Sequence, residues 1–247
     1  MKGGAEKAPL ATQPTPITLD SPAAPIVRWN EADCAVVEKP SGMLTQGGPR
    51  GVPNLVDWAI DWFRTPHASV INRIDRNVSG LVLIALRPER ARQLHRAMQQ
   101  GLIERHYLAI VKMPRSLEGL PPLIEAPLVK DPLHNLVRVA RADEAGAEMA
   151  KTKVRLRERF QAPIGWLAEV EASLESGRSH QIRVHLAWAG APIVGDPKYG
   201  LPARGIRRPL LHAWKLVFPH PSGTSLVEVR APLPWRLEEL RSLRSAR

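Results

Sequence analysis

Short apolar segments with the patterns of β-strands recur along this chain and outnumber the segments with helical spacing. Residues Leu81–Leu86 form an uninterrupted apolar run that is typical of a buried strand. Residues Trp166–Leu174 alternate with a period of two, which places Trp166, Ala168, Val170, Ala172 and Leu174 on one face. Several strand-like neighbours lie close enough in sequence to pair as antiparallel strands. We therefore predict an α+β fold with a mixed, largely antiparallel sheet and flanking helices.

The predicted elements cover most of the chain from residue 26 onward. Strands are predicted at residues 35–38, 81–86, 105–112, 153–160, 166–174, 213–218 and 226–229. Helices are predicted at residues 54–64, 88–100, 179–189 and 235–243. Residues 116–150, rich in Pro and acidic residues, are expected to form loops and irregular strands. Residues 1–24 are rich in Pro, Ala and Thr without periodicity, so we predict a disordered leader before one folded domain, residues 25–247.

The chain carries an excess of positive charge, which favours a polyanionic partner. Its 35 Lys and Arg residues exceed its 24 Asp and Glu residues, and the formal net charge is +11. No apolar run reaches the roughly 18–20 residues that span a bilayer, and the N-terminal residues lack a signal-peptide pattern. The one cysteine, Cys34, excludes an intrachain disulfide. We therefore expect a cytoplasmic protein without a membrane span. For the oligomeric state, which no sequence feature indicates, a monomer is the default expectation.

The first segment that indicates chemistry is Asn72–Gly80, which leads into the apolar run. It places Asp75 between Arg73 and Arg76 in a loop before a buried strand. Nearby cationic charge keeps a carboxylate ionised, and an ionised, positioned Asp can act as a nucleophile or a base. From the local sequence alone, a structural ion pair is the commoner use of such a group.

Two later segments concentrate polar side chains. Gly177–His185 opens a predicted helix, and its polar side chains cannot all be buried beside Ile182, so several are expected to face a groove. A solvated helix face is the alternative. Its two histidines are five positions apart, which argues against a two-histidine metal site. Pro192–Gly200 contains Gly, Asp, Lys and Tyr in a tight loop that by itself indicates only a turn.

Taken together, these segments resemble the RluA-type family of pseudouridine synthases. That family carries His-Arg-Leu-Asp-Arg-x-Thr-Ser-Gly and Gly-Arg-x-His-Gln-Ile-Arg-Val-His motifs, which correspond to Asn72–Gly80 and Gly177–His185. Further family motifs match Lys39–Gly42, Tyr107–Val111, Gly195–Gly200 and Leu211–Pro221. The six motifs occur in a consistent order over about residues 30–230, which makes the resemblance highly specific. It implies a pseudouridine synthase-like catalytic domain at residues 25–247.

The resemblance also implies roles for individual residues. Asp75 matches the catalytic aspartate, Tyr107 the tyrosine that stacks on the target base, and Arg183 the basic residue that pairs with the aspartate. The structural alternative for Tyr107 is an aromatic side chain in the core, and that for Arg183 is an arginine on the surface. Arg73 matches an arginine thought to fill the space left by the flipped nucleotide. The residues expected to contact the substrate are Arg73, Arg76, Arg178, His180 and Gln181.

Three positions depart from the family pattern. Asn72 replaces the usual His, Ile74 the usual Leu, and Val78 the usual Thr. The change to Ile is mild, whereas Asn removes a titratable ring and Val removes a hydroxyl. The departures concern substrate choice or loop geometry more than the reaction. Members of the family often carry an N-terminal S4 RNA-binding domain, and residues 1–24 are too few for one, so RNA binding is expected to rest on the catalytic domain itself.

The predicted function is isomerisation of a specific uridine in structured RNA, either rRNA or tRNA, to pseudouridine. Asp75 would attack C1′ of the ribose or remove a proton from C2′, and the sequence leaves both routes open. The resemblance implies no cofactor and no metal. Asn72 and Val78 motivate an alternative, a catalytically inert RNA-binding or RNA-chaperone relative. A metal-dependent nuclease would need clustered carboxylates or suitable His pairs, and none is evident in the sequence.

Overall fold

The computed structural model describes residues 23–113, 120–141, 143–223 and 225–246. The predicted leader, residues 1–24, lies outside this part of the chain except for its last two residues. No helix among the described residues is both long enough and apolar enough to cross a membrane.

The described residues contain eleven strands and four helices. The strands are β1 Ile26–Glu31, β2 Cys34–Lys39, β3 Ser69–Val70, β4 Ser79–Ala85, β5 Glu104–Lys112, β6 Leu123–Asp131, β7 Leu136–Val139, β8 Glu148–Ala162, β9 Gly165–Leu174, β10 Leu211–Pro219 and β11 Leu226–Arg230. The helices are α1 Leu55–Phe63, α2 Pro88–Gln99, α3 Gln181–Trp188 and α4 Leu237–Leu240.

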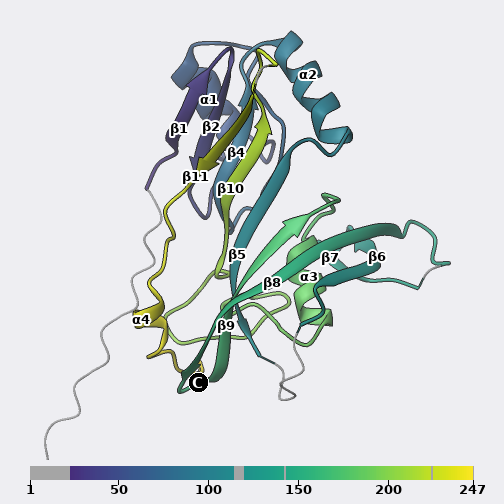
Figure 1. Ribbon diagram of the computed structural model, residues 1–247, viewed down its shortest axis with the longest axis vertical. Helices are drawn as coiled ribbons and strands as arrows, with labels where there is room; N and C mark the ends of the chain where they lie inside the picture. Colours follow the sequence, from purple (N-terminus) through teal and green to yellow (C-terminus); the bar gives the residue numbers. More distant parts are fainter. Residues whose placement is uncertain (1–22, 114–119, 142, 224, 247) are drawn as a thin grey trace, which may run out of the picture.

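All eleven strands belong to one sheet, with the order β1-β2-β4-β10-β5-β9-β8-β6-β7, while β11 pairs with β10 and β3 with β4. Only β4 and β10 pair in parallel, so the predicted mixed, largely antiparallel sheet is confirmed. In Figure 1, β1, β2, β4 and β11 lie in the upper half with α1 and α2, and β6, β7, β8 and β9 lie in the lower half with α3. The central strands β10 and β5 connect the two halves.

The helices cover both faces of the sheet. Leu55 of α1 and Ile182 of α3 join the same apolar cluster on one face. Leu94 of α2 packs on the opposite face of the upper strands, and Leu240 of α4 packs on that of the lower strands. Because the cluster beneath α1 and α3 is continuous, it holds the segments that carry the candidate site against each other.

Local capping explains where α1 begins and ends. The Asn54 side chain accepts a hydrogen bond from the Asp57 N–H at 3.1 Å, which satisfies a donor of the first turn. Arg64 ends the helix in the left-handed conformation (φ 50°), and its N–H binds Ile60 O. The predicted helix at residues 54–64 therefore has the expected bounds.

The close approach of β10 to β4 depends on a glycine. Gly80 pairs with Ala213 in the parallel ladder and has φ of 121°. A Cβ atom at this position would overlap the backbone of Ala213. The glycine therefore allows β10 to lie beside the start of β4, directly after the loop that carries Asp75.

Three parts of the sequence prediction need correction. Residues 116–150 contain the regular strands β6 and β7 and the beginning of β8, because backbone pairing overrides their weak apolar pattern. Residues 114–119 lie outside the described part. The C-terminal helix spans only Leu237–Leu240. Trp166 is 49% exposed, although Ala168, Val170 and Ala172 share the predicted buried face.

Candidate active site

The loop before β4 and the helix α3 face each other across a cleft of about 830 Å³. The residues that line it include Asp75 from the loop, Tyr107 from β5 and Arg183 from α3. A loop, a strand and a helix far apart in sequence thus bring together the three residues that the motifs single out. A cleft of this size accommodates a nucleotide-sized group.

Arg183 connects two carboxylates at the centre of the cleft. Its Nη1 donates to Asp75 Oδ2 at 2.7 Å. Its Nε and Nη2 donate to the two oxygens of Asp196 at 2.7 and 2.8 Å. This two-pronged contact orients the guanidinium plane so that the remaining edge meets Asp75.

The Arg183–Asp196 pair is buried, and its charges stabilise each other. Burial opposes the charged forms, but hydrogen bonds and the negative charges of both carboxylates raise the pKa of Arg183 above its ordinary value. Burial likewise opposes ionisation of Asp196, yet the hydrogen bonds from Arg183 lower the pKa of this carboxyl group. Asp196 also accepts the N–H groups of Lys198 and Tyr199. Asp196 is therefore an ionised anchor for Arg183.

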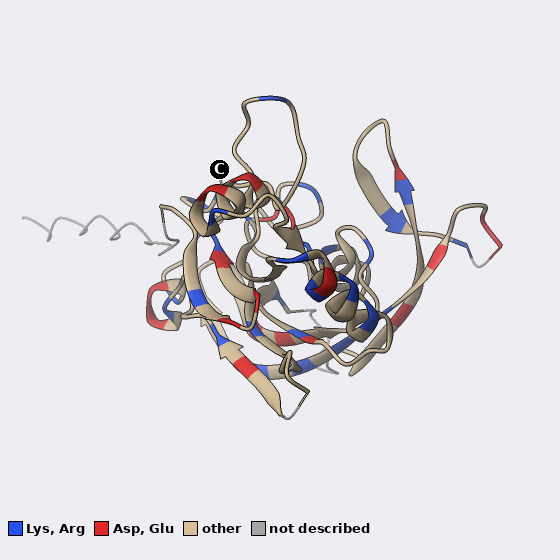
Figure 2. Cartoon of the chain, turned by 90° about the horizontal axis from the view of Figure 1, so that it is seen from above, with Lys and Arg blue, Asp and Glu red and all other residues tan. Residues whose placement is uncertain are grey.

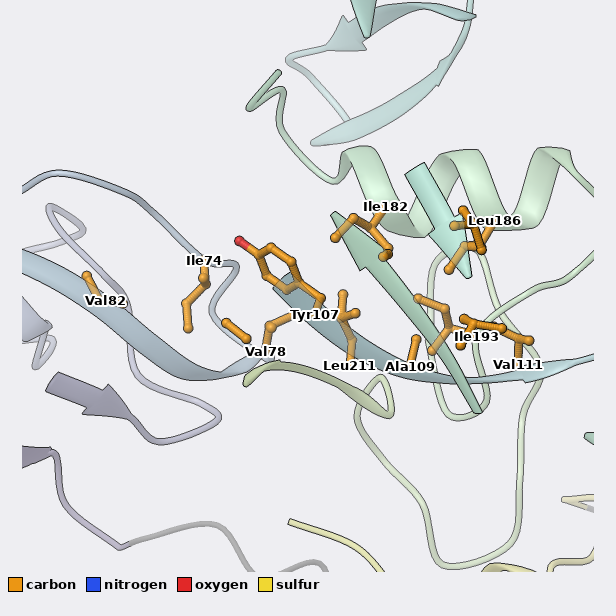
Figure 3. Packing of buried hydrophobic residues seen from close by; sticks show 14 of the residues in the cluster. Ile74, Val78, Val82, Tyr107, Ala109, Val111, Ile182, Leu186, Ile193 and Leu211 are labelled. Carbon is orange, nitrogen blue, oxygen red and sulfur yellow. The ribbon is translucent and has the colours of Figure 1, made fainter. Parts of the chain in front are cut away.

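Tyr107 forms one wall of the cleft. Figure 3 shows its ring between Ile74 and Val78 on one side and Ile182 on the other, with the hydroxyl directed away from the core. Burial raises the pKa of Tyr107 to about 12. The side chain is therefore a neutral phenol at physiological pH, and it presents a ring and a hydroxyl to the cleft.

Side chains behind the loop hold Asp75 in place. Thr45 Oγ1 donates to Ile74 O at 2.7 Å and accepts the Ile74 N–H at 3.3 Å. The fully buried Lys39 donates to the carbonyl oxygens of Pro40, Met43 and Arg76 at 2.8, 2.7 and 3.2 Å. Backbone groups on both sides of Asp75 are therefore fixed, which limits movement of the carboxylate.

Basic side chains surround the cleft. Arg73 is exposed and makes no hydrogen bond or ion pair with the part of the chain that the structure describes. Arg76 Nε donates to Gly42 O at 2.9 Å, and Arg178 pairs with Glu148 at 2.9 Å. Arg105, which sequence reasoning did not single out, also lines the cleft and donates to Leu174 O and Ser176 O at 3.3 Å each.

A family model described as RNA pseudouridylate synthase matches residues 33–188, which is more than half of the chain. The chain belongs to this family. It is 32% identical over 213 residues to ribosomal large subunit pseudouridine synthase D of Nitrosomonas europaea, covering 81% of this chain and 59% of that protein. It is 30% identical over 239 residues to ribosomal large subunit pseudouridine synthase C of Escherichia coli, covering 91% and 72%.

A solved structure of human RNA pseudouridylate synthase domain containing 1 has the same fold, with a TM-score of 0.69 at 21% identity. The alignment covers 86% of this chain and 85% of that one. The chain spans 59–65% of the length of three curated relatives that it matches. The family resemblance and the fold class expected from the sequence are thus confirmed.

The departures from the family motif have structural explanations in this chain. Asn72 is buried, its Oδ1 accepts the Leu83 N–H at 2.8 Å, and its Nδ2 donates to Leu81 O at 3.3 Å. It therefore ties the loop that carries Asp75 to the backbone of β4. Val78 and Ile74 lie in the apolar cluster beside Tyr107. All three replacement residues line the cleft and support this loop.

Gln181, which is predicted to contact the substrate, lines the cleft and also makes buried hydrogen bonds. The side chain is 2% exposed, and its Oε1 accepts from Ser176 Oγ and Arg178 N. Its Nε2 donates to Lys151 O and Thr152 Oγ1. An amide has two donor and two acceptor positions of this kind, so its capacity is used in holding residues 176–178. Several polar side chains of this segment were expected to face a groove, and Arg178, His180 and Arg183 line the cleft, whereas His185 is fully buried against Thr152.

His180 lies beside the Asp75–Arg183 pair, and the sequence indicated no partner for it. Its Nε2 is 4.0 Å from Asp75 Oδ2, and its Nδ1 is 2.7 Å from the hydroxyl oxygen of Tyr199. The sequence signals for Asp196 and Tyr199 were present in Gly195–Gly200, but a tight loop does not show what its side chains reach. Among the described residues, no group of three or more His, Cys, Asp or Glu could hold a metal ion.

Proposed function

We propose that this chain is a pseudouridine synthase that isomerises a uridine in ribosomal RNA, with Asp75 as its catalytic carboxylate. The observation that carries the proposal is the Arg183–Asp75 contact of 2.7 Å beside the phenol of Tyr107. The family membership supports the reaction class. The oxygen Oδ2 of Asp75 binds Arg183, whereas Oδ1 accepts no hydrogen bond from the described residues and can act on the ribose.

The reaction conserves every atom and needs no change of oxidation state. The bond between C1′ and N1 of uracil breaks, the base turns, and a bond from C1′ to C5 forms while the C5 proton leaves and N1 gains one. Asp75 frees the base either by attacking C1′ or by removing a proton from C2′. Arg183 pairs with the Asp75 carboxylate when no substrate is bound.

Tyr107 supports the base during this turn. Its ring lies on the wall of the cleft, where a flipped uracil can stack on it. Because its pKa is raised to about 12, the hydroxyl is a proton donor and not a base in the free protein. We assign Tyr107 to stacking and to hydrogen bonding with the departing uracil.

RNA binding is assigned to the basic rim. The target base must leave its stack before its glycosidic bond becomes accessible, and single-stranded or looped RNA makes this least costly. Arg73, Arg76, Arg105 and Arg178 stand around the opening, where phosphates would lie. Figure 2 shows Lys and Arg distributed over several strands and helices of the described part of the chain. His180 is assigned to the ribose.

The names of the relatives favour ribosomal RNA over transfer RNA, because both relatives described above are large-subunit enzymes. We assign the catalytic domain to residues 25–247 and place the protein in the cytoplasm, where ribosomal RNA is modified. A monomer is sufficient, since one chain contributes Asp75, Tyr107 and Arg183 to the cleft.

The test is to incubate the full chain with total RNA from a strain that lacks its gene. Carbodiimide-dependent stops of reverse transcription then map pseudouridines that the protein adds. We expect new sites in large-subunit ribosomal RNA with the wild type and none with Asp75→Asn. RNA binding by Asp75→Asn should persist, because the substitution keeps the size of the side chain.

Two results would contradict the proposal. Absence of new sites, with equal RNA binding by both proteins, would favour the inert RNA-binding relative. New sites made equally by Asp75→Asn would remove Asp75 from catalysis. Sites confined to transfer RNA would keep the reaction and overturn only the assigned target.

A further inference from the structure

Tyr199 connects a backbone group of β7 to the centre of the cleft. Its hydroxyl oxygen is 2.8 Å from the backbone nitrogen of Val137 and 2.7 Å from Nδ1 of His180. Its ring also lies against the Arg183 guanidinium, with 5.1 Å from Cζ to the ring centroid. The side chain is thus held at three points, and its hydroxyl cannot rotate freely to another partner.

The donors available limit the directions of these hydrogen bonds. A backbone N–H can only donate, so Val137 donates to the Tyr199 oxygen. The hydroxyl hydrogen remains available for the contact with His180 Nδ1, which accepts it when the ring carries its proton on Nε2. Burial raises the pKa of Tyr199, so this hydrogen stays on the phenol. A nitrogen that accepts carries no proton, which leaves the proton of a neutral imidazole on Nε2.

The surroundings of His180 favour the neutral ring. Burial lowers its pKa, with further lowering by the positive charges of Arg183 and Lys198 and opposition from Asp75 and Asp196. His180 also has a left-handed backbone conformation, with φ of 54°, at the N-terminus of α3. Such a conformation is costly for a residue other than glycine, and it persists where the surrounding structure imposes it.

The resulting arrangement is a donor and an acceptor close enough for one hydroxyl group to contact both. His180 Nε2–H and Asp75 Oδ2 are 4.0 Å apart, too far for a direct hydrogen bond. A hydroxyl group between them would accept from His180 and donate to Asp75. The reaction takes place at C1′ or C2′ of the ribose, and the hydroxyl adjacent to both carbons is the 2′-hydroxyl.

We propose that the Tyr199 hydroxyl fixes His180 in the tautomer with its proton on Nε2, and that His180 and Asp75 together bind the 2′-hydroxyl of the target ribose. This inference rests on the proposed function. His180 is then a substrate-contacting residue that distinguishes ribose from deoxyribose, and Tyr199 is a positioning residue that acts through it.

The tautomer can be measured on the full chain without any RNA. In protein labelled with ¹⁵N-histidine, long-range proton–nitrogen correlations distinguish the two ring nitrogens. The signals absent from His180→Gln identify His180 among the eight histidines of the chain. We expect a proton on Nε2 in the wild type at neutral pH, and a mixture of tautomers in Tyr199→Phe. A proton on Nδ1, a doubly protonated ring, or an unchanged tautomer in Tyr199→Phe would overturn the positioning role.

The 2′-hydroxyl contact is tested by single-turnover kinetics. The RNA segment identified by mapping is synthesised with uridine or 2′-deoxyuridine at the target position. Loss of the hydroxyl should slow the wild type by roughly 10- to 100-fold, as for hydrogen bonds that involve a charged group. In His180→Ala the same change should cost at least about fivefold less, because only the Asp75 contact remains to be lost. The intrinsic effect of deoxyribose on the reaction is common to both proteins and cancels in the ratio.

The conservative variant provides the control. His180→Gln places an N–H group near the position of Nε2, so it should recover most of the sensitivity to deoxyribose that His180→Ala loses. Equal penalties in the wild type and His180→Ala would overturn the ribose contact. If no protein converts the uridine RNA, the proposed function has failed, and the ¹⁵N measurement still decides whether Tyr199 sets the tautomer.

Discussion

At the scale of single residues, Asp196 shows how a buried side chain orients another toward the cleft. It holds Arg183 through two hydrogen bonds and leaves one edge of the guanidinium for Asp75. Asp196→Asn replaces an acceptor oxygen by a donor and removes a charge, so Arg183 loses its orientation. We expect turnover to fall by roughly 10- to 100-fold, since one charge-assisted hydrogen bond is lost. Single-turnover rates and RNA dissociation constants measure the effect separately.

A matched substitution separates this effect from a general loss of negative charge. Asp61 is exposed on α1 and outside the cleft lining, so Asp61→Asn should leave the rate unchanged. An Asp196→Asn protein with wild-type turnover would show that Asp75 needs no oriented Arg183. Equal losses of rate and RNA affinity would indicate a structural role for Asp196.

Tyr107 permits a prediction about pH. Its phenol has a pKa raised to about 12 by burial, so it keeps its proton throughout the usual range of measurement. Tyr107→Phe retains the ring and should therefore keep the shape of the pH–rate profile below about pH 10, at a lower rate. A rate that rises toward alkaline pH in the wild type, and does not rise in Tyr107→Phe, would show that Tyr107 acts as a base.

The sequence motifs predicted Asp75, Tyr107 and Arg183 because each occupies a recognisable position in a motif, and the structure brings the three together in one cleft. The buried partners of Gln181 were not predictable from the motif, for a physical reason. Whether a polar side chain meets solvent or a buried partner depends on segments distant in the chain, here residues 151 and 152 of β8. Sequence periodicity contains no information about such partners.

At the scale of elements, the turn after β2 depends on one buried amino group, that of Lys39. Burial lowers the pKa of Lys39 from 10.5 to about 7, against the opposing effect of Asp75. The folded state therefore binds a proton more weakly than the unfolded state between these values. Stability rises with pH across this range and is lost as the pH falls toward 7. The slope from this group alone is at most about 1.4 kcal/mol per pH unit.

Lys39→Met should remove this slope while lowering stability overall, because three carbonyl oxygens lose their donor. Denaturant unfolding of both proteins between pH 7 and 10 measures the difference in free energy. We expect the wild type to gain stability relative to Lys39→Met as the pH rises. Parallel curves would show that Lys39 titrates at its ordinary value in the folded protein.

Long periodic segments were the predictable elements. The helices at α1 and α2 and the strands at β4, β5 and β9 were expected near their observed bounds, since apolar spacing and local caps define them. The hairpin of β6 and β7 was missed. Its residues alternate weakly, and its edge strand Leu136–Val139 is stabilised by pairing and by the Tyr199 contact to Val137.

At the scale of the whole molecule, the order of the strands in the sheet could not be predicted from the sequence. β10, which is late in the chain, lies between β4 and β5, and this insertion depends on the absence of a side chain at Gly80. The fold class and the antiparallel pairing of strands follow from local sequence patterns. The order of the strands depends on which surfaces, distant in sequence, pack against each other. The cleft exists because this order places α3 opposite the loop of Asp75.

The whole surface also sets the dependence of RNA binding on salt. Each phosphate neutralised by the protein contributes about 0.7–0.9 to the slope of log affinity against log salt. Arg73 is exposed at the cleft and has no partner among the described residues, so it is available for a phosphate. Arg73→Gln should reduce the slope by about that amount. The control Arg230→Gln removes an equal charge from β11, outside the cleft lining, and should leave the slope unchanged. Equal reductions in both variants would mean that RNA affinity reflects net charge, whereas an unchanged slope with slower turnover in Arg73→Gln would place Arg73 in the space left by the flipped base.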